Sequence, residues 1–303
     1  MATSHGTVLI TGGTGSLGRQ AARAIAEADP RVHIVITGRG AAHAEATART
    51  LREQTKADVT GMQLDLGSLA EVQAFAERLT AMSLPPLRGL VCNAGLQNAS
   101  GARTSKDGYE LTFAVNHLAH FALIQHLRPH LDDDGAARIV MVASDTHDPA
   151  KPTGMPAPSY TTAEDMARPG EDTALEGRRR YTMSKLCNVL MAYELARRLS
   201  GTGITVNAFD PGLMPGTGLA REYGGVQAFA WRYVMPALVV VPGLNIHTPR
   251  RSGRALGRLV TAPEHAETTG EYFSGYRRIP SSDDSYDTVK AEDLWKTSER
   301  LVG

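Results

Sequence analysis

The sequence contains almost no cysteine. Among its 303 residues, only Cys92 and Cys187 carry thiols. Small secreted proteins commonly depend on several disulfides, and two cysteines do not supply such a framework. The cysteine content therefore indicates a protein of a reducing compartment.

The sequence also has no excess of charge of either sign. Lysine plus arginine and aspartate plus glutamate each total 32, so the formal net charge is zero. Proteins whose main partner is a nucleic acid usually carry a basic excess that neutralises phosphates. We therefore expect a small-molecule substrate, and no nucleic acid, as the binding partner.

Long hydrophobic runs are missing as well. The longest apolar stretch, residues 234–244, is interrupted by Pro236 and Pro242. It is shorter than the ~20 residues that cross a bilayer as a helix. Residues 1–7 lack the basic start and the extended apolar segment of a secretory signal. We expect a cytoplasmic protein with no transmembrane segment.

What the sequence does have is a regular alternation of short apolar runs and helical patterns. The runs are apolar at nearly every position, as in strands that are buried on both faces of a parallel sheet. The expected strands cover residues 8–10, 32–36, 90–92, 139–142 and 204–206. The expected helices cover residues 17–28, 41–54, 69–79, 107–127 and 181–199. This order predicts an α/β protein with a doubly wound parallel sheet, the Rossmann fold, in a single domain over residues 1–303.

Two stretches interrupt the alternation. Residues 147–177 hold five prolines and predict a long insertion on the surface. Residues 212–249 mix glycine and proline with Trp231 and Tyr233. They follow the carboxyl end of a strand, where ligands bind in such sheets, and they predict a small lid over the substrate. For both stretches, a loop without a function is the alternative interpretation.

A glycine-rich turn lies between the first expected strand and the first expected helix. Glycine lets the backbone approach a pyrophosphate closely, and the start of a helix offers free N–H groups to an anion. The position of the turn between a strand and a helix strengthens the interpretation as a dinucleotide site. The predicted binding residues in this turn are Gly12, Thr14, Gly15, Ser16, Leu17 and Gly18.

The end of the second expected strand indicates which dinucleotide binds. An enzyme that uses NAD usually has an acidic residue about 20 residues after the glycines, where it binds the ribose hydroxyls. Here Gly38 and Arg39 occupy that region, and the planar guanidinium suits a 2′-phosphate. We therefore predict NADP(H) as the cofactor, with a solvated surface arginine as the alternative.

Later strand ends supply further cofactor candidates. Asp65, after the third strand, is suited to bind the adenine amino group, and Leu66 beside it belongs to the same predicted site. The segment Asn93-Ala94-Gly95 follows the fourth strand and brings backbone close to the adenosine ribose. Neither feature is diagnostic when taken alone.

Tyr181 and Lys185 are the first candidates for chemistry. They lie four residues apart at the start of an expected helix, so they share one face. This spacing is common, and a surface lysine beside a core tyrosine is the alternative interpretation. A phenol can donate a proton to a developing alkoxide if a nearby ammonium favours its ionised form. Ser144 ends a strand, where its hydroxyl can bind a substrate oxygen. Asn116 lies within an expected helix, where asparagine often marks a kink or a hydrogen-bond relay. A solvated helix face is the simpler alternative.

Together these pieces resemble the short-chain dehydrogenase/reductase family, across roughly residues 6–275. The resemblance implies that Tyr181 is the acid/base and that Lys185 binds the nicotinamide ribose and tunes Tyr181. It further implies that Ser144 polarises a carbonyl and that Asn116 anchors a water relay, without a metal ion. Pro211 and Gly212, which also match, would pass beside the nicotinamide. Ser16 departs from the family pattern, which usually has a glycine there.

Local motifs resemble the branch that contains retinol dehydrogenases and light-dependent protochlorophyllide reductases. The motifs are residues 115–121, 184–188 and 216–222, together with the long gap between Ser144 and Tyr181. The protochlorophyllide reductases have a cysteine directly after their Pro-Gly, whereas this sequence has Leu213. That difference makes protochlorophyllide reduction the less favoured alternative.

Three functions follow from these observations. The leading one is an NADP(H)-dependent carbonyl reductase or alcohol dehydrogenase that acts on a small hydrophobic metabolite. The second is a C=C reductase of the protochlorophyllide type, and the third is a non-catalytic NADP(H) sensor. The resemblance also implies a homodimer or homotetramer, formed through the helices that carry Asn116 and Tyr181.

Overall fold

The structure is a computed structural model that describes residues 6–98, 100–131, 137–215 and 245–303. Its centre is one eight-stranded sheet with the order β3-β2-β1-β4-β5-β6-β7-β8. The strands are β1 (Thr7–Ile10), β2 (His33–Gly38), β3 (Val59–Gln63), β4 (Leu87–Cys92), β5 (Arg138–Val142), β6 (Thr205–Asp210), β7 (Glu271–Ser274) and β8 (Arg277–Arg278). All neighbours are parallel except β7 and β8.

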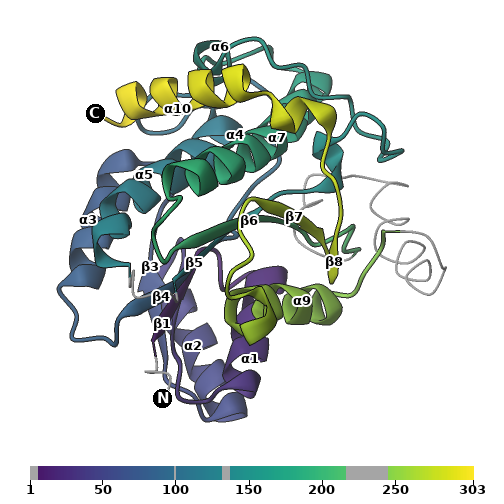
Figure 1. Ribbon diagram of the computed structural model, residues 1–303. Coiled ribbons are helices and arrows are strands. Elements are labelled where there is room, and N and C mark those ends of the chain that lie inside the picture. Colours follow the sequence, from purple (N-terminus) through teal and green to yellow (C-terminus); the bar gives the residue numbers. More distant parts are fainter. Residues whose placement is uncertain (1–5, 99, 132–136, 216–244) are drawn as a thin grey trace.

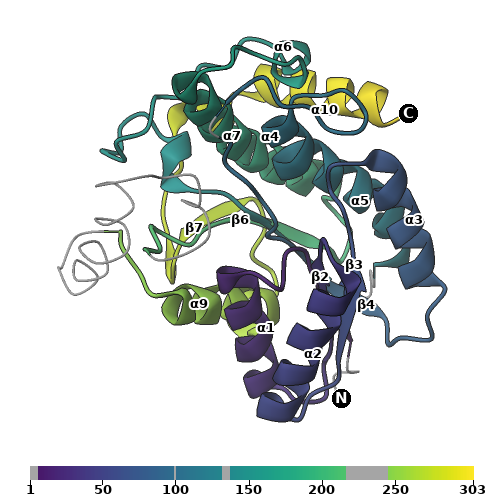
Figure 2. The same cartoon turned by 180° about the vertical axis from the view of Figure 1, so that it is seen from behind.

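Helices cover both faces of the sheet (Figures 1 and 2). One face carries α1 (Ser16–Ala28), α2 (Ala41–Thr55) and α9 (Pro249–Thr261), which bury Ile25, Leu51 and Leu256 in one core. The other face carries α3 (Leu69–Thr80), α5 (Ala119–Leu127) and α7 (Ala174–Arg198), which share a second core. The predicted doubly wound α/β fold is confirmed.

The five expected strands are present, and most of them are longer than expected. The third strand, expected before Asp65 without a residue range, is β3, whereas β7, β8, α9 and the C-terminal helix α10 (Thr288–Val302) were not expected. In β7 the outer residues Glu271 and Ser274 are polar and only half-buried, so no continuous apolar run marks this strand. The apolar residues of α9 are separated by four arginines, which hides a helix whose inner face is nonetheless buried.

The predicted helix over residues 107–127 was wrong at its start and in its regularity. The helical segment begins with α4 (Leu111–Phe113), because the Glu110 carboxylate accepts hydrogen bonds from the N–H groups of Thr112 and Phe113. Gly108 has a φ of +86°, which places it in a turn before the helix. A π-helical turn, η1 (Ala114–Leu118), then leads into α5.

The predicted helix over residues 181–199 also began too late. In the structure, α7 starts at Ala174, and the Thr173 hydroxyl caps it by accepting a hydrogen bond from the Glu176 N–H. Tyr181 therefore lies about two turns inside the helix instead of in its first turn. An interior position holds the side chain more firmly than a frayed helix end would.

The proline-rich stretch 147–177 is only partly a surface excursion. It contains the short helix α6 (Ala163–Ala167), whose Ala163 and Met166 are buried. The Asp293 carboxylate of α10 accepts hydrogen bonds from the Tyr160 hydroxyl and the Ala163 N–H, at 2.7 and 2.9 Å. Part of the stretch is thus fixed to the C-terminal helix. Most of the predicted lid, residues 216–244, lies outside the described residues.

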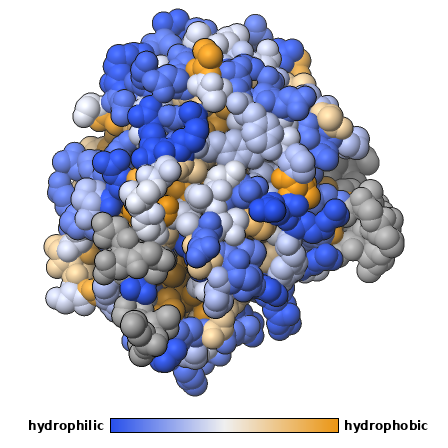
Figure 3. Space-filling view, in the orientation of Figure 1, coloured by the Kyte–Doolittle hydropathy of each residue, from blue (hydrophilic) through white to orange (hydrophobic). Residues whose placement is uncertain are grey.

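The face of the molecule in Figure 3 is mostly hydrophilic, with apolar side chains in small patches. This distribution fits a chain whose apolar residues are largely packed against the sheet. Of the helices that the structure describes, none combines the length and the apolar character needed to cross a bilayer.

Candidate functional site

A large cleft of about 1580 Å³ opens at the carboxyl ends of the central strands. Ligands bind at this edge in open α/β sheets. The cleft brings together nearly all predicted site residues, namely Gly12, Thr14, Gly15, Ser16, Leu17, Gly18, Arg39, Asp65, Leu66, Asn93, Ala94, Gly95, Ser144, Tyr181, Lys185, Pro211 and Gly212. Asn116 differs from these because it is fully buried behind the cleft.

The glycine-rich turn has the geometry that a pyrophosphate needs. Gly12 has a φ of +63°, in the left-handed region that favours glycine. A Cβ atom at Gly18 would lie 2.7 Å from both the Gly12 carbonyl and the Asn93 amide nitrogen, so the turn packs too closely for a side chain. Helix α1 begins at Ser16 after Gly15, and no side chain caps its first N–H groups. Those groups are therefore available to an anion.

The ends of β1 and β4 are joined by short hydrogen bonds beneath this turn. The Thr11 hydroxyl accepts hydrogen bonds from the N–H groups of Asn93 and Ala94, at 2.9 and 3.0 Å. The Asn93 amide donates to the Thr11 carbonyl at 2.7 Å. These contacts fix the backbone on which a dinucleotide would lie. The sequence analysis did not single out Thr11 as part of the site.

At the far end of the cleft, Gly38 ends β2 and Arg39 follows it. A Cβ atom at Gly38 would lie 2.8 Å from the Thr14 methyl group, so a larger residue would crowd the glycine-rich turn. The Arg39 side chain is exposed and lines the cleft. Asp65, nearby, accepts a hydrogen bond from the Gly67 N–H and pairs with Lys106 at 3.1 Å. Burial opposes ionisation of Asp65, but these two partners outweigh it and lower the pKa of its carboxyl.

Asn116 lies in the π-helical turn and anchors the loop after β4. Its side-chain nitrogen donates to the Leu96 carbonyl and to the Ser184 hydroxyl, both at 2.9 Å. Its side-chain oxygen accepts from the Leu96 N–H at 2.8 Å. The expectation that an asparagine here marks a helix irregularity is confirmed by the π turn.

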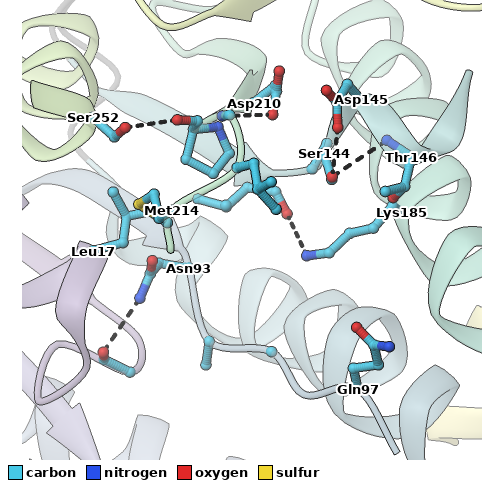
Figure 4. A pocket seen from close by; sticks show the side chains of 18 of the residues that line it. Leu17, Asn93, Gln97, Ser144, Asp145, Thr146, Lys185, Asp210, Met214 and Ser252 are labelled. Atoms are coloured by element: carbon cyan, nitrogen blue, oxygen red, sulfur yellow. Dashed lines mark hydrogen bonds between the residues drawn. The ribbon is translucent and has the colours of Figure 1, made fainter. Parts of the chain in front are cut away.

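Tyr181 and Lys185 lie side by side on the buried face of α7. The Lys185 ammonium is 5.5 Å from the centroid of the Tyr181 ring and donates to the Val142 carbonyl at 3.2 Å. Burial lowers the pKa of Lys185 to about 8. Figure 4 shows this ammonium pointing into the cleft, near the side where Ser144 and Asp145 lie. An ammonium so close to a phenol favours the ionised form of that phenol.

Ser144 follows β5 and caps the short helix η3 (Asp145–His147). Its hydroxyl accepts from the Thr146 N–H and donates to the Asp145 carboxylate, both at 3.3 Å. Both contacts are long, so a substrate oxygen can replace the carboxylate as the acceptor.

The sequence analysis missed a pair of carboxyl groups beside Ser144. One amide nitrogen of Asn245 donates to Asp145 and to Asp210, at 2.9 and 2.8 Å. The Ser274 hydroxyl also donates to Asp210, at 3.0 Å. Burial raises the pKa of both carboxyls, and the charge of Asp210 raises that of Asp145 further. Both aspartates adjoin strand ends, which is a usable sequence signal, whereas Asn245 lies in a loop and had none.

Pro211 and Gly212 continue from Asp210 along the cleft wall. Gly212 has a φ of +71°, and its N–H donates to the Asp210 carboxylate at 2.8 Å. The Ser252 hydroxyl of α9 donates to the Pro211 carbonyl at 2.6 Å. The backbone of this segment is therefore fixed from both sides.

Comparison with known proteins identifies the family of this chain. The sequence pattern of the short chain dehydrogenase family matches residues 6–162. The chain belongs to the short-chain dehydrogenase family. As a member of this family it is an oxidoreductase, and its match extends over the glycine-rich turn, Asn116 and Ser144.

Individual relatives cover nearly the whole chain. The human WW domain-containing oxidoreductase is 33% identical over 303 residues, which cover 97% of this chain and 67% of the relative. Human retinol dehydrogenase 13 is 30% identical over 298 residues, covering 98% and 84%. Protochlorophyllide reductase A of Triticum aestivum is 32% identical over 322 residues, covering 99% and 81%. The predicted resemblance to the branch of the latter two is confirmed.

One solved structure has a fold similar to that of this chain. The structure described as the Pseudomonas aeruginosa RhlG/NADP active-site complex has a TM-score of 0.66 and 23% sequence identity. The match covers 90% of this chain and 96% of that one. Because the sequence identity is only 23%, this comparison supports the fold and nothing further.

Proposed function

We propose that the protein is an NADP(H)-dependent oxidoreductase that interconverts the carbonyl and alcohol forms of a small, largely apolar metabolite. The observation that carries the proposal is one cleft that holds both the glycine-rich turn and the pair Tyr181 and Lys185. When bound, the nicotinamide would supply or accept the hydride. The turn fits such a dinucleotide because its glycines leave room for a backbone approach and its helix start is uncapped.

The side chains have separable tasks in this proposal. Tyr181 donates its phenolic proton to the oxygen of the reduced carbonyl, and the Lys185 ammonium favours the resulting phenolate. The Ser144 hydroxyl donates a hydrogen bond to the same substrate oxygen. Asn116 keeps the loop at Leu96 in place and anchors the path by which Lys185 exchanges protons with water.

The choice of NADP(H) over NAD(H) rests on Arg39. Its guanidinium is exposed at the cofactor end of the cleft, and no acidic side chain follows β2 to bind a free 2′-hydroxyl. A guanidinium binds a phosphate through charge-assisted hydrogen bonds. The presence of NADP in the complex of the similar fold supports this choice.

The substrate end of the cleft has a mixed lining. Apolar surface comes from Met155, Leu213 and Ile246, while Asp145 and Lys151 add charged groups. This composition favours a substrate with an apolar body that carries a polar group next to the reacting carbon.

Reduction of a C=C bond is the second candidate. It is supported by the similarity to protochlorophyllide reductase A and by the shared local motifs. It is disfavoured by Leu213, which stands where that branch has a cysteine. A non-catalytic NADP(H) sensor is the third candidate, and it leaves the joint presence of Ser144, Tyr181 and Lys185 unexplained.

The test is a panel of carbonyls and alcohols offered to the purified protein with NADPH and, separately, with NADH. Turnover is followed by the absorbance of the reduced nicotinamide, and Tyr181→Phe serves as the inactive control. We expect carbonyl reduction with NADPH. Reduction of protochlorophyllide under illumination without any carbonyl turnover would favour the second candidate, and NADPH binding without any turnover would favour the third.

A further inference from the structure

We propose that His120 is a positioning residue that couples the cofactor turn to Asn116. His120 lies in α5, one helical turn after Asn116, and its side chain is fully buried. It does not line the cleft. The proposal rests on the function proposed above, because it assigns His120 a part in that reaction.

Both ring nitrogens of His120 are engaged, and each contacts a different part of the site. Nδ1 lies 3.1 Å from the backbone carbonyl oxygen of Asn116, in the π-helical turn. Nε2 lies 2.9 Å from the hydroxyl oxygen of Thr11, the residue directly before Gly12. The ring therefore bridges the end of β1 and the turn that holds Asn116.

The partners fix which nitrogen carries the proton. A backbone carbonyl only accepts, so Nδ1 must donate to Asn116, and Nε2 of a neutral ring must then accept from Thr11. The Thr11 hydroxyl accepts from the N–H groups of Asn93 and Ala94 and has one proton to give. Nε2 of His120, at 2.9 Å, is nearer to it than its other acceptor, the Val91 carbonyl at 3.3 Å. Burial lowers the pKa of His120 to about 4, so the ring is neutral at neutral pH and acts through hydrogen bonds.

With these bonds, two separate chains of hydrogen bonds connect Thr11 to Asn116; we call the two together the circuit and each chain an arm. One arm runs from Thr11 through the backbone of residues 93–96 to the Asn116 side chain, which bonds to both backbone groups of Leu96. The other arm runs from Thr11 through His120 to the Asn116 carbonyl. Any shift of the glycine-rich turn on dinucleotide binding therefore reaches Asn116 by two routes. The route through His120 reaches the backbone of Asn116, whereas the other route reaches its side chain.

The chain offers a matched control one residue after Asn116. His117 is equally buried, and its Nε2 lies 2.9 Å from the Ser298 hydroxyl of α10. It packs against the ring of Phe113, away from Thr11. A substitution at His117 thus removes a buried histidine from the same turn without breaking the circuit.

The experiment compares His120→Phe, His120→Asn, His120→Gln and His117→Phe in the full chain. NADPH affinity is measured by titration without substrate, and kcat and its pH profile are measured with a carbonyl that the wild type reduces. We expect His120→Phe to weaken NADPH binding and to lower kcat, each by roughly five- to tenfold, the effect of about one net hydrogen bond. His117→Phe should change the melting temperature but neither of these quantities.

The two amide variants separate the arms of the bridge. The Asn amide lies where Nδ1 lies, so His120→Asn should recover kcat and its pH profile more than NADPH affinity. The longer Gln amide reaches the position of Nε2, so His120→Gln should recover NADPH affinity more than kcat. The two amide variants remain a test even if His120→Phe does not fold. Loss of packing alone would lower NADPH affinity and kcat together in both variants, instead of one quantity more in each.

Equal losses in the two amide variants, or losses in His117→Phe that match those in His120→Phe, would overturn the positioning role. The proposed function would stand in that case, since the wild type would still bind and use NADPH. A wild type that binds no nicotinamide nucleotide would overturn the proposed function, and the role of His120 with it.

Discussion

At the scale of single residues, the environment of Tyr181 determines what its phenol can do. Tyr181 is 5% exposed, its ring lies under the Lys185 ammonium, and the residue lines the same cleft as Ser144. A tyrosine on the surface would lack both the nearby cation and the exclusion of water. The buried setting is what turns a common residue pair into a candidate acid and its modulator.

We predict that Tyr181→Phe lowers turnover by roughly 10²–10⁴, the usual contribution of a positioned general acid. The ring and its packing remain, so the melting temperature and the affinity for NADPH should stay close to those of the wild type. Steady-state kinetics and a cofactor titration check this. Carbonyl reduction at nearly the wild-type rate would contradict the assignment and favour C=C reduction, whose proton can come from another group.

For Arg39, we predict a change in cofactor preference. Arg39→Ala should weaken NADPH binding tenfold or more, because one charge-assisted phosphate contact contributes about 1.5–3 kcal/mol. NADH binding should change little, since it has no 2′-phosphate. Titration of both nucleotides against the wild type and the variant gives the answer, with Arg49→Ala on the outer part of α2 as a control. Equal affinity of the wild type for the two nucleotides would rule out the prediction.

At the scale of elements, the ends of β5 and β6 and the loop at residue 245 meet in the Asp145–Asn245–Asp210 arrangement. Buried Asp210 and half-buried Asp145 share one amide donor there, so only one of the two carboxyls is readily ionised. Because burial raises the folded-state pKa of both, the folded state holds protons more tightly than the unfolded chain, whose value is near 3.8. The stability contribution is therefore complete below that pH and is lost as the pH rises through the raised values.

Asp145→Asn should remove the loss of folding stability that the carboxyl pair causes at neutral pH. We predict that the variant is more stable than the wild type at pH 7, by about 1 kcal/mol, the relief of one like-charge contact. The difference should shrink as the pH falls towards 3.8. Denaturant unfolding of both proteins across this range measures it, and exposed Asp283→Asn provides the control. A wild type that is more stable than the variant at pH 7 would show that the pair is not repulsive.

At the scale of the whole molecule, α10 lies along α7 on the outside of the fold (Figure 1). Trp295 of α10 meets the Phe121 ring edge-on at 5.0 Å, and the Arg198 guanidinium lies 4.3 Å from the Trp295 ring. Ser298 of the same helix bonds to His117. We expected a homodimer or homotetramer to form through the helices that carry Asn116 and Tyr181. On this face, α10 of the same chain covers them. We expect any such assembly to use another surface.

We predict that Trp295→Ala destabilises the fold by roughly 3–5 kcal/mol, the usual cost of truncating a buried aromatic side chain. It should also promote self-association, because it opens the apolar surface under α10. Denaturant unfolding and light scattering measure the two effects. Val289→Ala, on the same helix but 77% exposed, should leave both unchanged. A small loss of stability would mean that α10 is only loosely attached.

The sequence by itself determined the class of the fold and predicted most of the residues that we assign to the candidate site. Continuous apolar runs such as 139–142 indicate strands that are covered on both sides, and glycines in a strand-to-helix turn indicate a close backbone approach. Tyr181 and Lys185 were predictable because helical periodicity is local. Asn116 was predictable as an irregularity because its helix propensity is poor, a property of one residue.

Only the tertiary structure decided what lies opposite each of these residues. The carboxyl pair needs Asn245, which is 100 residues from Asp145, and the His120 bridge needs Thr11, which is 109 residues away. Neither pairing leaves a periodic or local signal in the sequence. The starts of the helices at Leu111 and Ala174 likewise depended on caps that compete with propensity. Contacts between distant residues are set by how the strands order themselves in the sheet, and that order is a property of the packed molecule.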